Sequence, residues 1–243
     1  MKKYLFNVLI LLYINFSAQN SSGKITYNHS MDSESLKKLD SMTQKNISKN
    51  PRINIWAKNL YKNMPDAKSY LNFTHVESLF FAEDKMDNEG ASKINLNKIL
   101  AGNGDKYYKN TKTNEYFHES SITELLLIEI EPKKWQITQE IKKIGDYLCY
   151  KAIDIESTNK KKKPIAWFTP QIPVSFGPLE FSGLPGLVLQ VEINKRLITA
   201  TQIILNPKEE IKIIKPTKGR KISAKENKER VKAFWKSLDE IKD

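Results

Sequence analysis

One stretch of this chain combines a stiff backbone with apolar side chains. It runs from Pro164 to Leu189 and holds five of the ten prolines and three of the nine glycines, interleaved with Trp, Phe and Leu. Proline fixes φ, and glycine permits backbone conformations that other residues avoid, so the path of such a segment is set locally. Flexible linkers are polar, whereas this stretch is apolar. We therefore predict a loop that packs against the rest of the protein.

The sequence around this loop predicts a β-rich fold. Residues 187–194 alternate in the two-residue period of a strand with one buried face. Residues 146–156 and 165–169 flank a lysine-rich tip and predict a β-hairpin. Further strand signals lie at residues 23–27, 69–82, 122–130, 135–138, 196–205 and 211–214. The aromatic pairs at 107–108 and 116–117 flank turn-forming residues at 109–115, which predicts a second β-hairpin.

Two regions instead carry helical spacing. Residues 31–64 have apolar side chains three or four positions apart, and Pro65 would end the segment. Over 52–64 the alternation of Ile53 and Ile55 also permits a strand, and helix is the better of the two interpretations. The sequence Ser223-Ala224-Lys225-Glu226 is a capping box that would open a C-terminal amphipathic helix. The predicted class is α+β: a large curved antiparallel sheet, open or closed into a barrel-like meander, with a helical insertion near the N-terminus and a C-terminal helix.

The N-terminus has the pattern of a signal peptide. Two lysines precede a short apolar run, and a small residue lies at the expected cleavage position after residue 18. We predict a signal peptide at 1–18, a single domain at 19–243, and a periplasmic or secreted product. The single cysteine, Cys149, lies far from the cleavage site, so no lipid-anchor cysteine is expected, and we predict that it is buried. Cleavage would lower the net charge from +12 to +10, because the leader holds two lysines and no acids.

The loop also carries a family resemblance. The run Gly183-Leu184-Pro185-Gly186-Leu187-Val188 is similar, with Val in place of a final Ile, to the signature of the GLPGLI family of exported Gram-negative, Bacteroidetes-type proteins. Shorter matches extend the resemblance over about residues 105–205. It implies export and a β-rich fold, and it supplies no catalytic residues, since the family has no assigned activity. Within the signature, Pro185 and Gly186 have the composition of a type II turn, so we interpret Gly183, Pro185 and Gly186 as structural turn residues.

Catalytic and metal-binding motifs are absent from the sequence. The three histidines lie in separate elements, and no nucleophile elbow, zinc-protease helix, phosphate loop or dinucleotide fingerprint occurs. We therefore predict no catalytic residues, no metal and no cofactor. Glu140 is the most interesting carboxylate, because held against apolar walls it could serve as a general acid. The favoured interpretation is a salt bridge to a lysine such as Lys142 or Lys151, or a cap on a turn.

The aromatic residues around the loop are the candidate ligand contacts. Such side chains can line a cavity for acyl chains or sugar rings, although each can equally serve the core. The residues are Trp135, Tyr147, Trp167, Phe168, Phe176, Phe181 and Leu184.

The function hypothesis is therefore a non-catalytic exported protein that binds a lipid, another hydrophobic or envelope-derived ligand, or an outer-membrane protein. The alternatives are a hydrolase of an envelope polymer or glycan, which requires either two carboxylates or a nucleophile and a base converging in a cleft, and a purely structural module. Export argues against nucleic acid as a partner. The basic C-terminal helix could also contact an anionic membrane surface.

Overall fold

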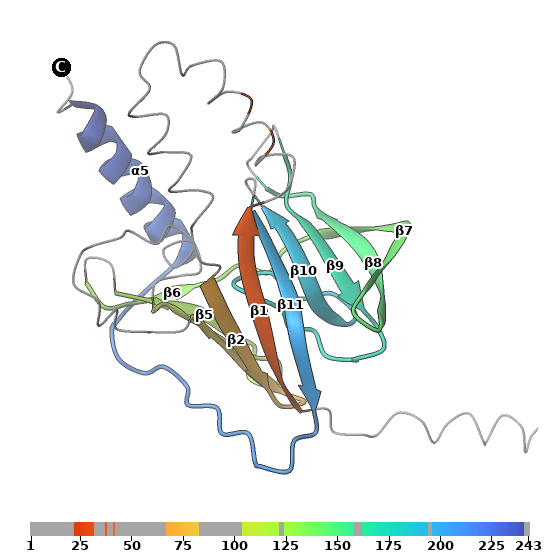
Figure 1. The fold of residues 1–243 in the computed structure, drawn as a ribbon. Helices are drawn as coiled ribbons and strands as arrows, with labels where there is room; N and C mark the ends of the chain where they lie inside the picture. Colours follow the sequence, from red (N-terminus) through yellow and green to blue (C-terminus); the bar gives the residue numbers. More distant parts are fainter. Residues whose placement is uncertain are drawn as a thin grey trace, which may run out of the picture.

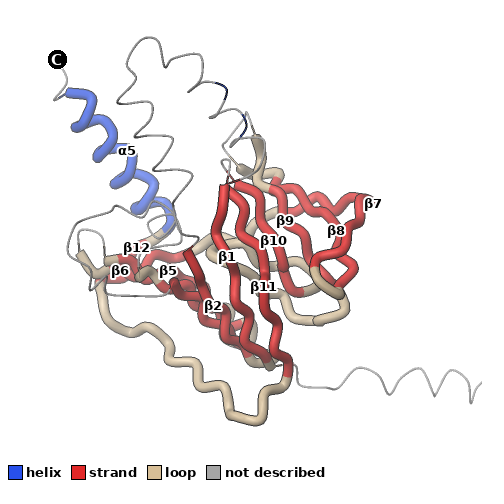
Figure 2. The backbone as a smooth tube through the Cα atoms, viewed as in Figure 1, coloured by secondary structure: helices blue, strands red, loops and turns tan. Residues whose placement is uncertain are grey.

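The computed structural model describes residues 22–31, 37, 41, 67–82, 104–121, 124–157, 162–193 and 196–240. These residues form one twelve-stranded sheet and one helix (Figures 1 and 2). The elements are β1 (Gly23–Met31), β2 (Ala67–Phe73), β3 (Glu77–Ala82), β4 (Lys106–Asn110), β5 (Glu115–Ser120), β6 (Leu126–Glu129), β7 (Trp135–Ile144), β8 (Tyr147–Asp154), β9 (Ile165–Thr169), β10 (Leu187–Ile193), β11 (Arg196–Leu205), β12 (Arg220–Ile222) and α5 (Ala224–Glu240).

The sheet is open. Its strand order is β12-β6-β5-β4-β3-β2-β1-β11-β10-β9-β8-β7, so β12 and β7 form its two edges. Every pairing is antiparallel except the one between β12 and β6, which is parallel. The first strand lies near the middle of the order, where it pairs with both β2 and β11. Strands adjacent in the sequence are thus mostly adjacent in the sheet, as short hairpin connections favour.

The predicted α+β class is wrong. The described residues are dominated by one sheet, and the single helix they contain, α5, lies at the C-terminal end. No helical insertion near the N-terminus is shown: of residues 31–64, the structure describes only Met31, which ends β1, and the two isolated helical positions Lys37 and Ser41, and the rest of the predicted insertion lies outside the described residues. The prediction left the sheet open or closed into a barrel, and the strand order shows that it is open.

The loop between β9 and β10, residues 170–186, fills the inside of the curved sheet, and we call it the plug loop. Phe176 contacts Phe73 of β2, with ring centroids 6.2 Å apart. Phe181 contacts Trp135 of β7, with ring centroids 6.4 Å apart. Since β2 lies near the middle of the strand order and β7 at one edge, one loop can touch both only if the sheet curves around it.

Burial confirms that the loop packs. Phe176, Phe181 and Leu184 are each at most 1% exposed, and they belong to the main core cluster together with Leu71 and Phe73 of β2. Burying a Leu or Phe side chain stabilises a fold by about 1.5–3 kcal/mol. The stiff apolar stretch is therefore the centre of the hydrophobic core, and the strands are arranged around it.

The Leu-Pro-Gly-Leu turn differs from the predicted type II turn. In that turn the fourth residue donates to the first, but Leu187 N donates instead to Ile172 O, at 3.0 Å. Gly186 N donates to Leu184 O at 2.8 Å and closes a tighter three-residue turn around the proline. Glycine is required here for close packing, because a Cβ on Gly186 would lie 2.2 Å from Thr169 O.

The other face of strands β4, β5 and β6 carries a smaller core. Tyr108, Phe117 and Leu127 cluster there, and Ile213 from the segment after β11 packs against them. The strand predicted at 211–214 is wrong, because these residues lie in an irregular segment that precedes β12.

The predicted cap and start of the C-terminal helix are confirmed. Glu226 N donates to Ser223 Oγ at 3.1 Å, as the capping box requires. The helix contacts β6, and Val231 on it is 47% exposed. Within the described ranges, no helix has the length and apolar character that crossing a membrane requires.

Candidate functional site

Two clefts flank the connector, residues 130–134, which joins β6 to β7. The first has a volume of about 550 Å³ and lies between the β4–β5 hairpin, the connector and the plug loop; we call it the hairpin cleft. The second, of about 480 Å³, lies on the other side of the connector and is called the connector cleft. Residues Glu129, Ile130 and Pro132 line both clefts.

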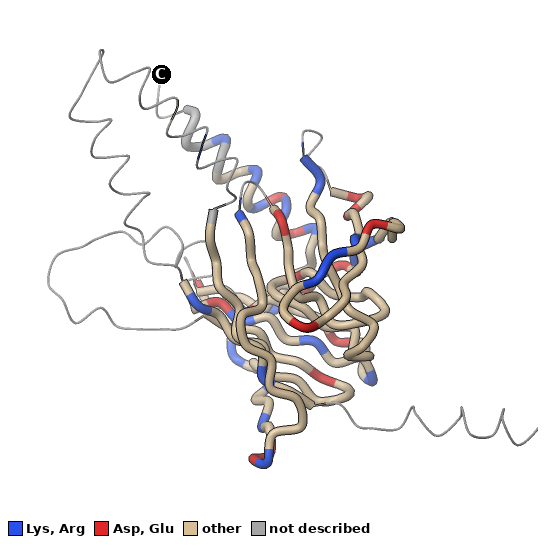
Figure 3. The backbone as a smooth tube through the Cα atoms, turned by 45° about the vertical axis from the view of Figure 1, so that its right-hand side comes forward, with Lys and Arg blue, Asp and Glu red and all other residues tan. Residues whose placement is uncertain are grey.

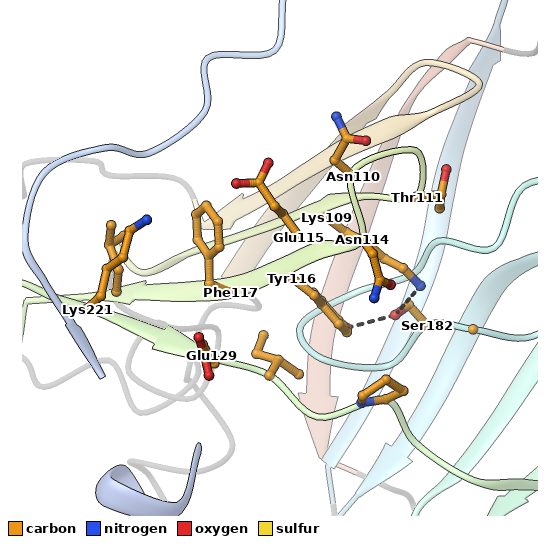
Figure 4. A pocket seen from close by; sticks show the side chains of 14 residues that line it. Lys109, Asn110, Thr111, Asn114, Glu115, Tyr116, Phe117, Glu129, Ser182 and Lys221 are labelled. Carbon is orange, nitrogen blue, oxygen red and sulfur yellow. Dashed lines mark hydrogen bonds between the residues drawn. The ribbon is translucent and has the colours of Figure 1, made fainter. Parts of the chain in front are cut away.

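A cluster of three polar side chains from three elements lies at one end of the hairpin cleft (Figure 4). Lys109 Nζ of β4 donates to Ser182 Oγ of the plug loop at 3.1 Å and to Ser175 O at 3.3 Å. Ser182 Oγ donates to Tyr116 Oη of β5 at 2.7 Å, and Tyr116 Oη donates to Glu180 O at 2.8 Å. The ammonium also lies 5.1 Å from the centroid of the Tyr116 ring. The hairpin and the plug loop are thus joined through this cluster.

Lys109 differs from the other half-buried lysines of the structure. Burial lowers its pKa from 10.5 to about 8. Lys133 pairs with Asp154 at 3.1 Å, and Lys151 pairs with Glu140 at 2.8 Å. By contrast, Lys109 forms no ion pair with any carboxylate in the described part of the chain, and its hydrogen-bond acceptors are uncharged oxygens.

The remaining lining of the hairpin cleft is mixed. Asn114, at the tip of the hairpin, has a φ of 56°, which asparagine tolerates better than most residues. Phe117 and Lys221 lie at the far end of the cleft from the Lys109 cluster (Figure 4). Glu115 forms an ion pair with Lys215, which lowers the pKa of its carboxyl. Amide, hydroxyl, aromatic and charged groups therefore all face the same space.

Two of the ring side chains that border the connector cleft are held in place by contacts with each other and with Asp105. His118 Nε2 lies 2.7 Å from Asp105 Oδ2, and its ring stacks on Tyr107 with centroids 4.3 Å apart. Burial, with the nearby Glu180 as a smaller cause, raises the pKa of Tyr107 well above its usual value. These contacts fix the two rings in place, and among the described residues that line this cleft none is a half-buried lysine without an ion pair.

The two clefts do not differ in charge as one basic and one acidic site would. Basic and acidic residues are interspersed along the described chain (Figure 3). In the ranges described above, no three His, Cys, Asp or Glu side chains come together in a group that could hold a metal ion.

Most predicted ligand contacts lie in the core. Phe168, Phe176, Phe181 and Leu184 are each at most 3% exposed. Tyr147 is partly buried and packs against the same cluster. None of them lines either of the two clefts. Their role as ligand contacts stays a prediction.

The two tryptophans predicted to contact a ligand, Trp135 and Trp167, stabilise the fold through hydrogen bonds from their indole nitrogens. Trp135 Nε1 donates to Ser182 O at 2.9 Å and so ties strand β7 to the plug loop. Trp167 Nε1 donates to Glu192 Oε1 at 3.0 Å, and Lys142 Nζ lies 4.0 Å from the centroid of its ring. Neither tryptophan lines the two clefts, so their part in binding also stays a prediction.

Two further expectations are confirmed by the structure. Glu140 forms an ion pair with Lys151 at 2.8 Å, as the favoured interpretation required. Cys149 is buried, and burial raises the pKa of its thiol to about 11. A thiol with so high a pKa is a poor nucleophile at neutral pH.

Sequence reasoning missed the Lys109 cluster. Residues 109–115 were interpreted as a turn between aromatic pairs, whereas Lys109 lies on strand β4. A usable signal was present, because Tyr107 and Lys109 are two positions apart and therefore share a face of the strand. Tyr107 packs against the main core, so Lys109 on that face had to be partly buried. Its partners Tyr116 and Ser182 are far apart in sequence, and no local pattern joins them.

Comparison with protein families gives one partial match. A family model described as "Protein of unknown function (Porph_ging)" matches residues 154–190. The match spans β9, the plug loop and the first half of β10, which is the segment that carries the signature hexapeptide. No curated protein matches the sequence.

Comparison with solved structures gives a likeness of fold. The structure of PNGF-II in space group P21 aligns with a TM-score of 0.51 and 18% identity, over 87% of this chain and 33% of PNGF-II. The C2 form aligns with a TM-score of 0.49 and 18% identity, over 86% of this chain and 32% of that one. This chain thus spans about a third of PNGF-II, and at this identity the likeness concerns the fold alone.

Proposed function

We propose that this chain is an exported envelope protein of the GLPGLI type that binds a ligand in the hairpin cleft without transforming it. The observation that carries the proposal is the Lys109 cluster, which places a polar group of unusual environment at one end of a cleft of about 550 Å³. Ligand sites are typically concave, largely preformed spaces with a few convergent polar groups. Export and family membership are supported by the leader-like residues 1–18, which lie outside the described residues, and by the signature at 183–188.

The lining favours a ligand with polar groups over a bare acyl chain. Asn114, Tyr116 and Ser182 present amide and hydroxyl groups to the cleft, whereas the apolar plug-loop side chains are packed inside the core. The Tyr116 and Ser182 hydroxyls are already hydrogen-bonded within the cluster, but an acyl chain would offer no partner to the Asn114 amide or to the third donor of the Lys109 ammonium, which costs free energy on binding. Partnership with an outer-membrane protein or an anionic membrane stays a prediction.

A matched pair of variants tests the site. Thr111 lines the hairpin cleft and Thr113, two residues along the same exposed turn, does not. Native mass spectrometry of the chain purified from the periplasm of its own host should show a bound small molecule on the wild type and on Thr113→Trp. Thr111→Trp should lose it, because the indole fills part of the cleft. Equal loading of both variants would place the ligand elsewhere, and a bare mass for the wild type would contradict the proposal.

One observation favours a second candidate function, hydrolysis by an acyl-transfer mechanism. Ser182 Oγ and Lys109 Nζ are 3.1 Å apart at the cleft, the arrangement of a serine nucleophile and a lysine base. In the first step the Ser182 oxygen would attack a carbonyl carbon, its proton would pass to neutral Lys109, and the leaving group would take that proton as its bond breaks. Water would then release the acyl group, again with Lys109 as base.

A covalent probe separates this function from simple binding. A fluorophosphonate should phosphonylate Ser182 with loss of fluoride if the pair is reactive, with a rate that rises as pH increases through the pKa of Lys109, about 8. The adduct would be located by peptide mass spectrometry, with Ser182→Ala as the control. An unlabelled Ser182 across this pH range would exclude the hydrolase.

A further inference from the structure

We infer that the ligand of the hairpin cleft carries a carboxylate, and that this carboxylate forms an ion pair with Lys109. The inference rests on the proposed binding function and names the ligand chemistry of that site.

The first argument is the unused capacity of the ammonium. A lysine ammonium has three hydrogen-bond donors. Two of them are directed at Ser175 O and Ser182 Oγ, at 3.3 and 3.1 Å. Both acceptors are uncharged, and no described carboxylate forms an ion pair with Lys109. A half-buried charge without a counter-charge is unfavourable, and an anion arriving through the cleft would supply the missing partner.

The second argument concerns the type of anion. Phosphate and sulfate recognition typically uses arginine forks, backbone amides or several cations together. Among the residues that line this cleft, Lys109 is joined by one other cation, Lys221, which lies at the opposite end (Figure 4). The carboxylates of Glu115 and Glu129 also border the space and would repel a dianion. One ammonium beside two hydroxyl groups matches a singly charged carboxylate.

The other ionisable groups around Lys109 leave it as the cation available to the ligand. On β5, Tyr116 stays neutral, because burial raises its pKa, and Glu115 is paired with Lys215. On the plug loop, the side chain of Glu180 lies 3.7 Å from Lys133. Affinity for a carboxylate should therefore follow the protonation of Lys109, which is complete well below pH 8 and lost above it.

Two matched pairs of probes test the inference by titration calorimetry. Glucuronate is compared with glucose, and N-acetylalanine with N-acetylalaninamide, because each pair differs at the carboxylate. At about pH 6.5 the full-length mature protein should bind one carboxylate with about 10-fold or more higher affinity than its neutral partner, as the strength of hydrogen bonds to charged groups implies. At about pH 9.5 most of this difference in affinity should be lost. The pair that responds shows whether the carboxylate belongs to a sugar acid or to a peptide-like ligand.

The variants Lys109→Met and Lys112→Met complete the test. Lys112 is exposed on the neighbouring turn and does not line the cleft. Lys109→Met should abolish the preference, and Lys112→Met should keep it. If neutral and anionic probes bind with equal affinity and Lys109→Met binds them like the wild type, the inference is overturned. If Thr111→Trp still weakens the binding of these probes, the proposed function is kept. If no probe binds and the wild type also carries no co-purified molecule, both fail.

Discussion

Replacing Lys109 by methionine should make the ligand-free protein more stable at neutral pH. Methionine keeps the length of the side chain and removes the half-buried charge. The replacement leaves no hydrogen-bond acceptor of Lys109 without a partner, because Ser175 O also accepts from Gly183 N at 3.1 Å and Ser182 Oγ is bonded to Tyr116. The lysine therefore costs stability in the free protein, as a residue kept for binding would.

The size of the effect follows from the pKa of Lys109, which burial lowers from 10.5 to about 8. One pKa unit corresponds to about 1.4 kcal/mol, so the shift represents about 3 kcal/mol; partial contact with water reduces this, and we expect a gain of about 1–3 kcal/mol. Between pH 8 and 10.5 the unfolded chain binds more protons than the folded one, so wild-type stability gains from rising pH in this window. The advantage of the variant should be complete below pH 8 and vanish near pH 10.5.

Urea unfolding of the wild type and Lys109→Met at a series of pH values measures this difference directly. Other groups that titrate in the alkaline range, such as Tyr27 and Tyr116, affect both proteins and cancel in the comparison. A variant that is less stable than the wild type at neutral pH, by an amount that does not change with pH, would refute the reasoning. Lys109 would then be a structural brace between β4 and the plug loop.

Three further predictions concern the core. Leu184→Ala should lower the free energy of unfolding by about 2–5 kcal/mol. Its control, Ile204→Ala, is at a position that is 41% exposed and should change this free energy by less than about 1 kcal/mol. If both variants lost a similar amount of stability, the plug loop would not be the centre of the core. Gly177→Ala should cost at least about 1–3 kcal/mol in thermal or urea unfolding, because the new Cβ would lie 2.1 Å from Phe181 O, and an unchanged midpoint would contradict this packing. Burial lowers the pKa of His29 from 6.5 to about 4, so between these pH values the unfolded state binds a proton that the folded state does not. The free energy of unfolding should therefore fall by up to about 3 kcal/mol as pH drops from 6.5 to 4. His29→Gln should flatten this pH dependence, and identical profiles for the variant and the wild type would exclude His29 as its cause.

The sequence predicted the strands where the pattern is local. The strand at 187–194, the hairpin around 107–117 and the capping box at Ser223 all depend on neighbouring residues, and each corresponds to an element of the structure. The single buried face predicted from the alternation at 187–194 is wrong: β10 is buried on both faces from Leu187 to Val191, because the plug loop also packs against it at Val188. The strand predicted at 211–214 failed because its apolar residues serve a different purpose. Ile213 packs onto the β4–β6 face from an irregular segment, a tertiary contact that local propensity does not encode.

The candidate site was less accessible to sequence reasoning than the fold. Aromatic residues beside a stiff loop predict ligand contacts, whereas the structure places Phe176 and Phe181 inside the core. The cleft is bordered instead by Lys109, Tyr116 and Ser182, which come from two strands and the plug loop. The separation of Lys109 from Ser182 along the chain is 73 residues, so only the curvature of the open sheet around the loop brings them together.

Sequence by itself determined the existence and the stiffness of the Pro164–Leu189 segment, because proline and glycine act on the backbone where they stand. It also determined the strands beside that segment, since alternation within one strand decides which side chains share a face. Tertiary structure alone decided that the loop is the plug of a curved, open sheet and that its turn is braced by Ile172 O. Tertiary structure also placed the ammonium of Lys109 beside a cleft and gave it no ion pair with a described carboxylate. Burial and ion pairing depend on which residues are close in space, and the local sequence does not specify them.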